Sequence, residues 1–482
     1  MPTTYLPELA RWVEQEHLAS DLINICSKLW LSTSTELMLF RKPLHHVTSS
    51  QVLSHHQHAA EVSGLPITIQ DTVLLASAIA RLAPAPSRID LGRLATEWHH
   101  ERGSVASVDS FVARKLADHT GHQQRTLTPK NVVLFGFGRI GRLVTRLLIS
   151  QTGRGEQLRL RAVVLRKCGP DDLIKRADLL RYDSVHGPFE GTIVEDIENL
   201  TLIINGQRIQ FIAAETPEDI DYTQYGIEDA LVIDNTGVFR DEAGLSRHLE
   251  SKGVERVLLT APAKGDIPNI VTGINDSVSK NKAIRIFSAA SCTTNAIVPV
   301  LKVIDDRFGI DKGHIETIHA YTNDQNLLDN YHKKYRRGRS AALNLVITET
   351  GAGSAVAKVM PNLAGKLTGN AVRVPTPNVS LAILHLTLKQ PSTKETVNGA
   401  LREAALYGPL IEQLEYAISN ELVSSDLVGN SHSSIVDSQA TLLSGDGTSV
   451  VIYVWYDNEC GYSHQVVRLA KKISDVVRIT YY

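Results

Sequence analysis

The sequence predicts an α/β protein that begins with an all-α extension. From about residue 129 onward, short runs rich in β-branched residues alternate with segments of helical periodicity, which is typical of a buried parallel sheet covered by helices. Before about residue 127, helical periodicity alone recurs. At 482 residues the chain is too long for one ordinary core, so two or three domains are expected.

The composition indicates a globular protein without a strong electrostatic partner. The chain is 43% hydrophobic and 21% charged, with a net charge of -2, which disfavours nucleic acid or an anionic membrane as a partner. No apolar run reaches the ~18 residues of a membrane span, and the N-terminus lacks the apolar region of a secretion signal. The four cysteines are scattered without CxxC spacing, which favours a reducing, cytoplasmic location over a disulfide framework.

Residues 1–127 form the predicted helical extension, and the sequence does not define its role. The segment 68–84 has the apolar spacing of one helical face, and the segments 87–102 and 104–121 repeat this style. His55 and His58 are one helical turn apart, but no cysteine or acidic partner lies beside them at ligand spacing. We therefore expect packed or solvated histidines here and no metal. The seam with the next domain is expected within residues 119–135.

The first α/β segment carries a glycine-rich turn between a strand and a helix. Residues 131–149 read NVVLFGFGRIGRLVTRLLI, in which Gly136, Gly138 and Gly141 form the GxGxxG pattern. The three glycines permit a tight turn, the approach of a pyrophosphate and close helix packing, and the helix N-terminus attracts the anion. The sequence thus predicts a Rossmann-type dinucleotide-binding domain, with further strands at 158–165, 230–235 and 256–262.

The end of the second strand bears on the choice of dinucleotide. An acidic residue there would bind the ribose 2′-hydroxyl of NAD, but the strand ends in Leu165, Arg166 and Lys167. Arg166 therefore favours binding of NADP, or of both NAD and NADP. The alternative is that Arg166 and Lys167 are only solvated charged residues at the end of the strand.

Cys292, in the stretch SAASCTTNAIVP, is open to three interpretations: a core residue, half of a disulfide bridge, or a nucleophile. The following residues 293–308 predict a helix, whose N-terminus would favour the thiolate. His319 ends a strand-like run downstream and could serve as the base, because the two residues need only be adjacent in space. From chemistry alone, a Cys292–His319 pair and two unrelated packed residues remain equally open.

A series of motifs resembles the phosphorylating glyceraldehyde-3-phosphate dehydrogenases, long bacterial forms of which carry N-terminal extensions. In order, the motifs are FGFGRIGR, YDSVHGPFEG, SCTTN, HAYTNDQ, TGA, KLTGNAVRVPTPNVS and WYDNECGYSHQVV. The resemblance runs from about Asn131 to the C-terminus, about three quarters of the chain, and leaves the extension unassigned.

The resemblance implies that Cys292 is the nucleophile and His319 its base. It implies oxidation of D-glyceraldehyde 3-phosphate, with NAD or NADP, through a thioester that inorganic phosphate converts to 1,3-bisphosphoglycerate, a step of glycolysis and gluconeogenesis. The residues that match the attacking-phosphate site are Ser291, Thr293, Thr350 and Gly351, and those that match the substrate-phosphate site are Thr322 and Arg373. The basic stretch HKKYRRGR has two interpretations. Either Arg336 or Arg339 contributes positive charge to these phosphate sites, or the stretch is only a solvated loop at a subunit interface.

The resemblance also implies cofactor contacts. Arg139 and Ile140 match the pyrophosphate turn, Thr236 lines the groove, Thr260 matches the adenine side and Asn458 the nicotinamide carboxamide. Two departures from the family pattern lie near the ribose, because Leu165-Arg166 replaces Asn-Asp and Tyr331 replaces a proline.

The sequence predicts a chain of three parts that assembles into a homotetramer. The three parts are the extension 1–127, a nucleotide-binding domain 128–291 completed by the C-terminal helix 457–482, and an α+β catalytic domain 292–456 with a mixed sheet. Two alternatives stay open: an erythrose-4-phosphate dehydrogenase on the same fold, and a non-catalytic NAD-binding regulatory protein that recruits a protein partner through the extension.

Overall fold

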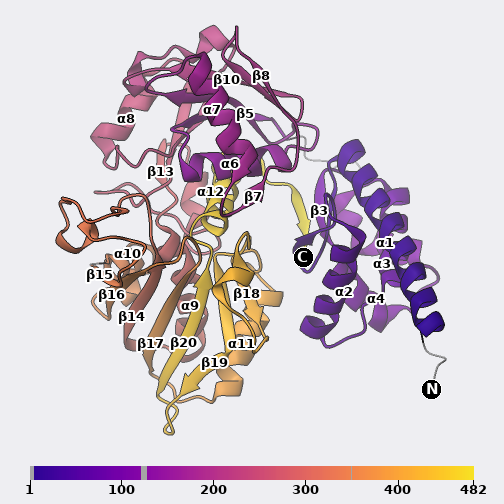
Figure 1. Ribbon diagram of the computed structural model, residues 1–482. Helices are drawn as coiled ribbons and strands as arrows, with labels where there is room; N and C mark the ends of the chain where they lie inside the picture. Colours follow the sequence, from indigo (N-terminus) through magenta and orange to yellow (C-terminus); the bar gives the residue numbers. More distant parts are fainter. Residues whose placement is uncertain (1–4, 121–126, 349) are drawn as a thin grey trace. The chain divides into compact units, whose positions relative to one another are not determined.

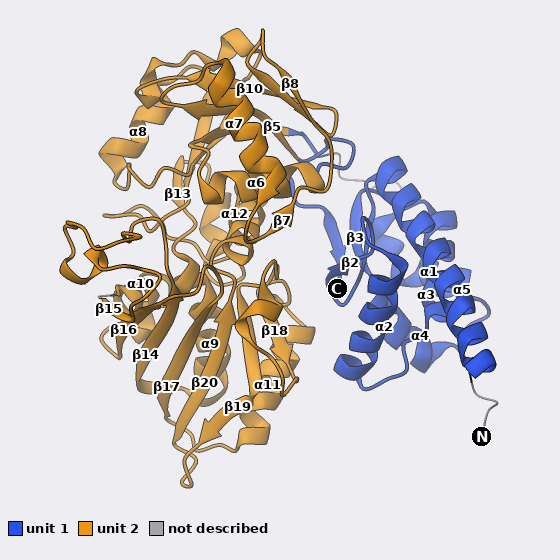
Figure 2. Ribbon diagram, viewed as in Figure 1, with its two compact units in different colours: residues 1–129, 152–157, 476–482 blue, residues 130–151, 158–475 orange. Residues whose placement is uncertain are grey.

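The computed structural model describes residues 5–120, 127–348 and 350–482. The chain divides into two compact units (Figure 2). The N-terminal unit comprises residues 1–129, 152–157 and 476–482, and the main unit comprises residues 130–151 and 158–475. Of the predicted seam between domains, residues 121–126 lie outside the described residues.

The N-terminal unit is helical, as expected from the periodicity of its sequence (Figure 1). Its helices are α1 (Tyr5–Thr33), α2 (Ser49–Ser63), α3 (Ile69–Leu82), α4 (Leu91–Glu101) and α5 (Val108–Lys115). The apolar face predicted for segment 68–84 is buried at Leu75, Ala78 and Ile79, in one core shared by all five helices. The cap of α3 is Thr68, whose side chain accepts a hydrogen bond from the Asp71 N–H.

These helices are accompanied by a small sheet that we did not predict from the sequence. Its order is β2 (Lys42–Pro43), β1 (Glu36–Leu39), β3 (Ser87–Asp90) and β21 (Ile479–Tyr481). Helix was expected from residue 87, but Ser87–Asp90 pairs in parallel with both β1 and β21. Helix α4 therefore begins only at Leu91, where the Asp90 carboxylate caps the Gly92 N–H at 2.8 Å.

The last residues of the chain belong to the N-terminal unit. We expected the segment 457–482 to complete the nucleotide-binding domain. Residues 457–475, which include helix α12 (Cys460–Ile473), lie in the main unit, but residues 476–482 lie in the N-terminal unit. The reason is the pairing of β21 with β3, which places Tyr481 against the core of the N-terminal unit. Arg478, just before β21, is 3% exposed, and its guanidinium lies 4.7 Å from the Trp30 ring.

The first half of the main unit is built on an eight-stranded sheet in the order β13-β12-β11-β4-β5-β10-β9-β8. The strands β13 to β10 of this order are parallel, as expected for a dinucleotide-binding fold, whereas β9 and β8 are antiparallel. The strand bounds are β4 (Lys130–Phe135), β5 (Leu158–Leu165), β8 (Ile193–Asp196), β9 (Thr201–Ile204), β10 (Gln207–Ala213), β11 (Ala230–Asp234), β12 (Val254–Leu259) and β13 (Ile286–Ser288). The helices are α6 (Arg139–Ser150), α7 (Pro170–Arg181) and α8 (Glu242–Glu250), and a two-stranded ribbon joins β6 (Tyr182–Asp183) to β7 (Gly187–Pro188).

The second half contains a mixed seven-stranded sheet, as expected for the α+β catalytic domain, in the order β15-β16-β14-β17-β20-β19-β18. Its strands are β14 (Ile310–Ala320), β15 (Val346–Thr348), β16 (Leu367–Val374), β17 (Ser380–Leu388), β18 (Leu414–Ala417), β19 (Ser434–Leu443) and β20 (Ser449–Tyr456). The helices α9 (Cys292–Phe308), α10 (Ala352–Val359) and α11 (Lys394–Leu406) pack on it and on one another through a continuous apolar core (Figure 1).

Among the described residues, no helix is long and apolar enough to cross a membrane, and no group of three or more His, Cys, Asp or Glu side chains could hold a metal ion. In the histidine-rich part of α2, His56 is buried and its ring nitrogens contact Val52 O and Thr72 Oγ1, both at 2.8 Å.

Candidate active site

Cys292 is the first residue of helix α9, as its sequence context indicated. Ser291 is the N-cap, and its hydroxyl accepts a hydrogen bond from the Thr294 N–H at 3.0 Å. Ala290 before it has a φ of 55°, and its carbonyl accepts the Tyr462 hydroxyl proton at 2.9 Å. Because a non-glycine residue rarely adopts this left-handed backbone, the contacts around Ala290 hold it there and fix the position of the thiol.

His319 faces the thiol from the end of strand β14. Its Nε2 atom lies 3.6 Å from Cys292 Sγ, and its Nδ1 lies 2.7 Å from the carbonyl oxygen of Ala320. A carbonyl can only accept, and Arg373 Nη1, 3.3 Å from Nδ1, already donates to Ala320 O and Thr322 Oγ1. We therefore assign the ring proton to Nδ1, which leaves an unprotonated Nε2 facing the thiol. The predicted pair of residues therefore has the geometry of a nucleophile and its base.

The surroundings of this pair favour its neutral forms. Burial lowers the pKa of His319 to about 4, with a further contribution from the positive charge of Arg373. Burial raises the pKa of the Cys292 thiol, while Arg373 and the Thr293 hydroxyl oppose that shift. A neutral His319 is able to take the proton of the thiol, and Arg373 and the N-terminus of α9 stabilise the thiolate that results.

The pair opens into a cationic cavity of about 450 Å³. Most of the predicted phosphate-binding residues line it, namely Ser291, Thr293, Thr350, Gly351 and Arg373. Its cationic residues are Arg240, Lys334, Arg337, Lys358 and Arg373, and no Asp or Glu is among the described residues that line it. Such a cavity attracts an anion with several charges.

Thr322 does not line the cavity, but it contacts a residue that does. Arg373 Nη1 donates to Thr322 Oγ1 at 2.9 Å and to Ala320 O at 3.0 Å. The Thr322 hydroxyl donates to Asp324, whose carboxylate also pairs with Arg337. Through Thr322 and Asp324 these contacts join Arg373 to Arg337 and hold both guanidinium groups in place.

Arg337 is a site residue that the sequence analysis missed. The basic stretch suggested Arg336 or Arg339, but both of these side chains are exposed, while Arg337 lines the cavity and donates through Nε to Thr348 Oγ1 at 3.2 Å. The reason is the short turn of 3₁₀ helix over Tyr335–Gly338, which directs one of three clustered arginines inward. No periodicity in the sequence distinguishes the three.

Asn458 is hydrogen-bonded to the first residue of β17, the strand that pairs with β14. Its Oδ1 accepts the Ser380 hydroxyl proton at 2.8 Å, and Ser380 Oγ in turn accepts the Ala320 N–H at 3.1 Å. This pairing fixes which end of the Asn458 amide is oxygen and leaves its amino group to donate elsewhere. Ser380 is a second residue that sequence reasoning did not identify.

The predicted dinucleotide turn has the required geometry. Gly136 has a φ of 95°, and a Cβ atom at Gly141 would meet Gly136 O at 2.6 Å, so both positions need glycine. At Gly138 an added Cβ would meet nothing within 4 Å, and α6 begins after it without a side-chain cap. The uncapped N-terminus of α6 and the open space beside Gly138 together fit a pyrophosphate.

A second cavity, of about 620 Å³, extends from this turn. It is lined by Gly136, Gly138, Arg166 and Thr236 among the predicted cofactor residues. Thr236 donates its hydroxyl to Asp234 at 2.7 Å, at the end of β11. Ile140, Gly141, Thr260 and Asn458 lie outside the lining of both cavities, and the Thr260 hydroxyl is bonded to Asp234 O at 3.0 Å.

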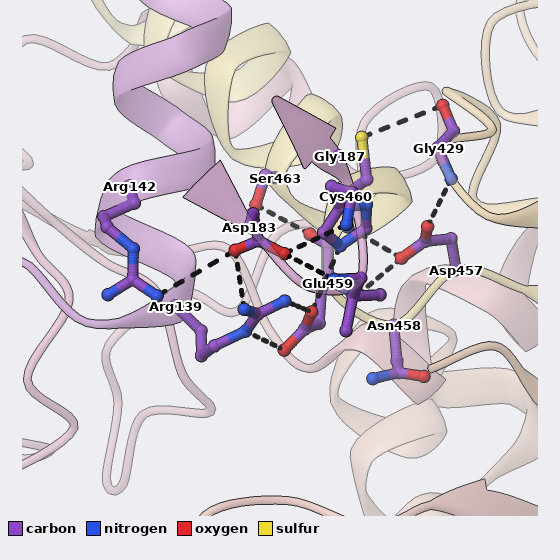
Figure 3. A network of polar contacts seen from close by, with 12 residues as sticks. Arg139, Arg142, Asp183, Gly187, Gly429, Asp457, Asn458, Glu459, Cys460 and Ser463 are labelled. Atoms are coloured by element: carbon purple, nitrogen blue, oxygen red, sulfur yellow. Dashed lines mark hydrogen bonds and ion pairs between the residues drawn. The ribbon is translucent and has the colours of Figure 1, made fainter. Parts of the chain in front are cut away.

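The side chain of Arg139 is held in an ion-pair network away from the turn (Figure 3). Its guanidinium contacts Asp183 at 2.6 Å and Glu459, which also contacts His186 at 3.1 Å. Burial raises the pKa of Asp183, but backbone N–H groups and Arg139 outweigh it and lower the value to about 2. An Arg139 contact with pyrophosphate must therefore come from its backbone N–H, while its side chain links α6 to the segment that carries Asn458.

Comparisons with known proteins agree with this geometry. The family models "Glyceraldehyde 3-phosphate dehydrogenase, NAD binding domain" and "Glyceraldehyde 3-phosphate dehydrogenase, C-terminal domain" match residues 130–242 and 291–458. A "Glyceraldehyde-3-phosphate dehydrogenase-like protein" of Pseudomonas aeruginosa is 52% identical over 85% of this chain and 88% of its own. That match is longer than residues 130–482, so it extends into the N-terminal unit.

Two further relatives match a smaller share of the chain. "Glyceraldehyde-3-phosphate dehydrogenase 1" of Bacillus subtilis is 42% identical over 70% of this chain and 96% of its own. "Glyceraldehyde-3-phosphate dehydrogenase GAPB, chloroplastic" of Arabidopsis thaliana is 41% identical over 76% of this chain and 79% of its own. The resemblance seen in the sequence motifs is confirmed, and the chain belongs to the glyceraldehyde-3-phosphate dehydrogenase family.

Proposed function

We propose that this protein oxidises D-glyceraldehyde 3-phosphate, with inorganic phosphate and NAD or NADP, to 1,3-bisphosphoglycerate. The observation that carries the proposal is the approach of Cys292 Sγ to His319 Nε2, 3.6 Å apart, at the edge of a cavity whose charged lining residues, among those that the structure describes, are cationic. A nucleophile beside a neutral base can capture an aldehyde, and a cationic cavity suits a phosphorylated substrate. Membership of the family supports the same reaction.

The chemistry assigned to the chain's own residues runs in three steps. His319 takes the thiol proton as the Cys292 sulfur adds to the aldehyde carbon, and it passes that proton to the aldehyde oxygen to give a hemithioacetal. Oxidation then removes the hydrogen of that carbon with its electron pair, while the neutral His319 takes the hydroxyl proton, and a thioester is left on Cys292. An inorganic phosphate oxygen attacks the thioester, the C–S bond breaks, and the acyl phosphate leaves as the sulfur regains a proton.

We assign the phosphate contacts by group. Ser291, Thr293, Thr350 and Gly351 would hold the attacking phosphate, through hydroxyls and backbone N–H groups. Arg373 and Thr322, which are hydrogen-bonded to each other, would bind the phosphate of the substrate, and Arg337 would add a second guanidinium. The Thr293 hydroxyl lies 3.0 Å from Tyr456 OH, a contact that orients it.

The residues present also fit a nicotinamide dinucleotide, because the uncapped start of α6 and the open space at Gly138 provide a place for its pyrophosphate. When bound, its nicotinamide supplies the acceptor for the hydrogen and electron pair removed from the substrate. Asn458 would orient the carboxamide, since its Oδ1 is already bonded to Ser380.

Rates with two aldehydes test this proposal against its nearest alternative. We expect reduction of the cofactor with D-glyceraldehyde 3-phosphate to depend on inorganic phosphate, and erythrose 4-phosphate to be a poorer substrate. Equal rates without phosphate, together with an acid product from erythrose 4-phosphate, would instead support the erythrose-4-phosphate dehydrogenase. No turnover with either aldehyde would support the non-catalytic alternative.

A homotetramer and a cytoplasmic location stay predictions. The face of the seven-stranded sheet opposite α9 carries partly exposed apolar side chains in two neighbouring strands, namely Leu381, Ile383, Val451, Tyr453 and Trp455. We infer that a second copy of the chain covers this face, since apolar sheet faces of this kind are typical of subunit interfaces. Sedimentation of the purified protein, with Tyr453→Glu as a disruptive variant, tests the inference.

Binding of a protein partner by the N-terminal unit also stays a prediction.

A further inference from the structure

Arg176 occupies an unusual position on helix α7. The buried residues of this helix are Leu173, Ala177 and Leu180, so residue 176 lies on the face that packs against the sheet. An apolar residue is expected there, because burying a guanidinium costs free energy unless its N–H groups are paired. Arg176 is nevertheless half-buried on this face.

The guanidinium of Arg176 borders the dinucleotide groove and makes no hydrogen bond or ion pair with the residues that the structure describes. It lines the 620 Å³ cavity, and its Nε is buried without a hydrogen-bond acceptor. Two carboxylates, Asp172 and Glu215, also line that cavity, but neither lies within 4.0 Å of Arg176 or shares a hydrogen bond with it in the described part of the chain. An unsatisfied donor group on a cavity wall indicates a ligand with acceptor oxygens.

Two more cations line the same cavity. Arg166 and Lys167 follow the last residue of β5, Leu165, and both are exposed on the groove. They stand where a dinucleotide fold that selects NAD places an acidic residue for the ribose 2′-hydroxyl. The carboxyl end of β5 and the inner face of α7 thus bring three positive charges to the ribose end of the groove.

We propose that Arg166 and Arg176 form a binding site for the 2′-phosphate of NADP, which makes NADP the preferred cofactor. Guanidinium groups bind phosphate oxygens through charge-assisted hydrogen bonds, and a phosphomonoester provides the acceptors that Arg176 lacks. Lys167 adds positive charge at the mouth of the site. The proposal rests on the proposed function in one respect, namely that this groove binds a nicotinamide dinucleotide.

Direct binding measurements test the site without relying on turnover. Isothermal titration of the full chain with NADP+, NAD+ and the fragment adenosine 2′,5′-bisphosphate should give at least about tenfold tighter binding of NADP+ than of NAD+. Arg176→Leu, which restores an apolar residue to the inner face of α7, and Arg166→Ala should each weaken NADP+ and the fragment about tenfold or more and leave NAD+ within about twofold. Lys175→Ala, on the exposed face of the same helix, is the matched control and should change neither affinity.

The outcomes distinguish this site from the proposed function. Equal or tighter binding of NAD+ by the unaltered protein, or an equal loss of both dinucleotides in Arg176→Leu, would overturn the 2′-phosphate site and leave the dehydrogenase reaction standing. Failure to bind either dinucleotide would overturn both proposals. If Arg176→Leu does not fold, the affinity ratio of the unaltered protein and the exposed Arg166→Ala decide the question.

Discussion

The sulfur of Cys292 lies 3.6 Å from Nε2 of His319, and the other ring nitrogen of His319 is bonded to a backbone carbonyl. One residue comes from the start of helix α9 and the other from the end of strand β14. With the ring proton assigned to the nitrogen that faces the carbonyl, the nitrogen that faces the sulfur can accept the thiol proton. In the proposed chemistry, the proton therefore moves from the Cys292 thiol to Nε2 of His319.

Substitution of His319 tests that relationship. We expect His319→Asn to lower kcat by about 10²- to 10⁴-fold, because the base is lost. Alkylation of Cys292 by iodoacetamide at neutral pH should slow as well, since the thiolate then lacks its proton acceptor. Unchanged alkylation would show that His319 does not control the thiol.

The pKa of His319, lowered to about 4, predicts a dependence of stability on pH. Between pH 6.5 and about 4 the unfolded chain binds a proton at this histidine that the folded chain does not. The free energy of unfolding is therefore fully maintained above pH 6.5 and decreases as the pH falls toward 4. His319→Asn removes this contribution, so its Tm should fall less than that of the unaltered protein between pH 7 and pH 5. A parallel decrease in both proteins would contradict the assignment.

Arg337 and Arg336 form a matched pair for testing the cationic cavity. Arg337 lines the cavity and pairs with Asp324, whereas Arg336 is exposed. Arg337→Ala should raise the KM for glyceraldehyde 3-phosphate about tenfold or more, because a charge-assisted contact is lost. Arg336→Ala should leave KM within about twofold. Similar increases in KM for both variants would indicate that the basic stretch acts through its overall positive potential and not through a specific contact of Arg337 with the substrate.

The C-terminal strand of the N-terminal unit allows a stability prediction. Tyr481 donates its hydroxyl to Glu97 at 2.5 Å, and the Arg93 guanidinium lies 4.8 Å from its ring. Tyr481→Ala should lower the free energy of unfolding of this unit by about 2 kcal/mol and increase hydrogen exchange in β3. Thr480→Ala, on the exposed face of the same strand, is the control. Equal exchange in both variants would contradict the packing role of Tyr481.

The sequence predicted the Cys292–His319 pair and the glycine turn because their motifs are local. The glycine turn and the SCTTN stretch each specify a short backbone geometry, and the structure has α6 and α9 begin where these motifs predict. The strands β4, β5, β11 and β12 were also predictable, because each is a short run of apolar, β-branched residues that favours a buried strand by itself.

The features that were missed depend on distant pairing. Ser87–Asp90 is a strand because β21, almost four hundred residues later, pairs with it, and no local propensity contains that information. Arg337 could not be separated from Arg336 and Arg339, since one turn of 3₁₀ helix decides which side chain enters the cavity. The position of Arg176 on the inner face of α7 became informative only once the groove beside it was defined.

The most direct test of the account is the mass of the protein during turnover. After incubation with glyceraldehyde 3-phosphate and the oxidised cofactor in the absence of phosphate, the account predicts an acyl group bound to Cys292, identified by peptide mass spectrometry. Addition of inorganic phosphate should remove that group and release an acyl phosphate, and Cys292→Ser should never carry it. An unmodified Cys292 while reduced cofactor accumulates, or an acyl group that phosphate does not remove, would contradict the thioester mechanism.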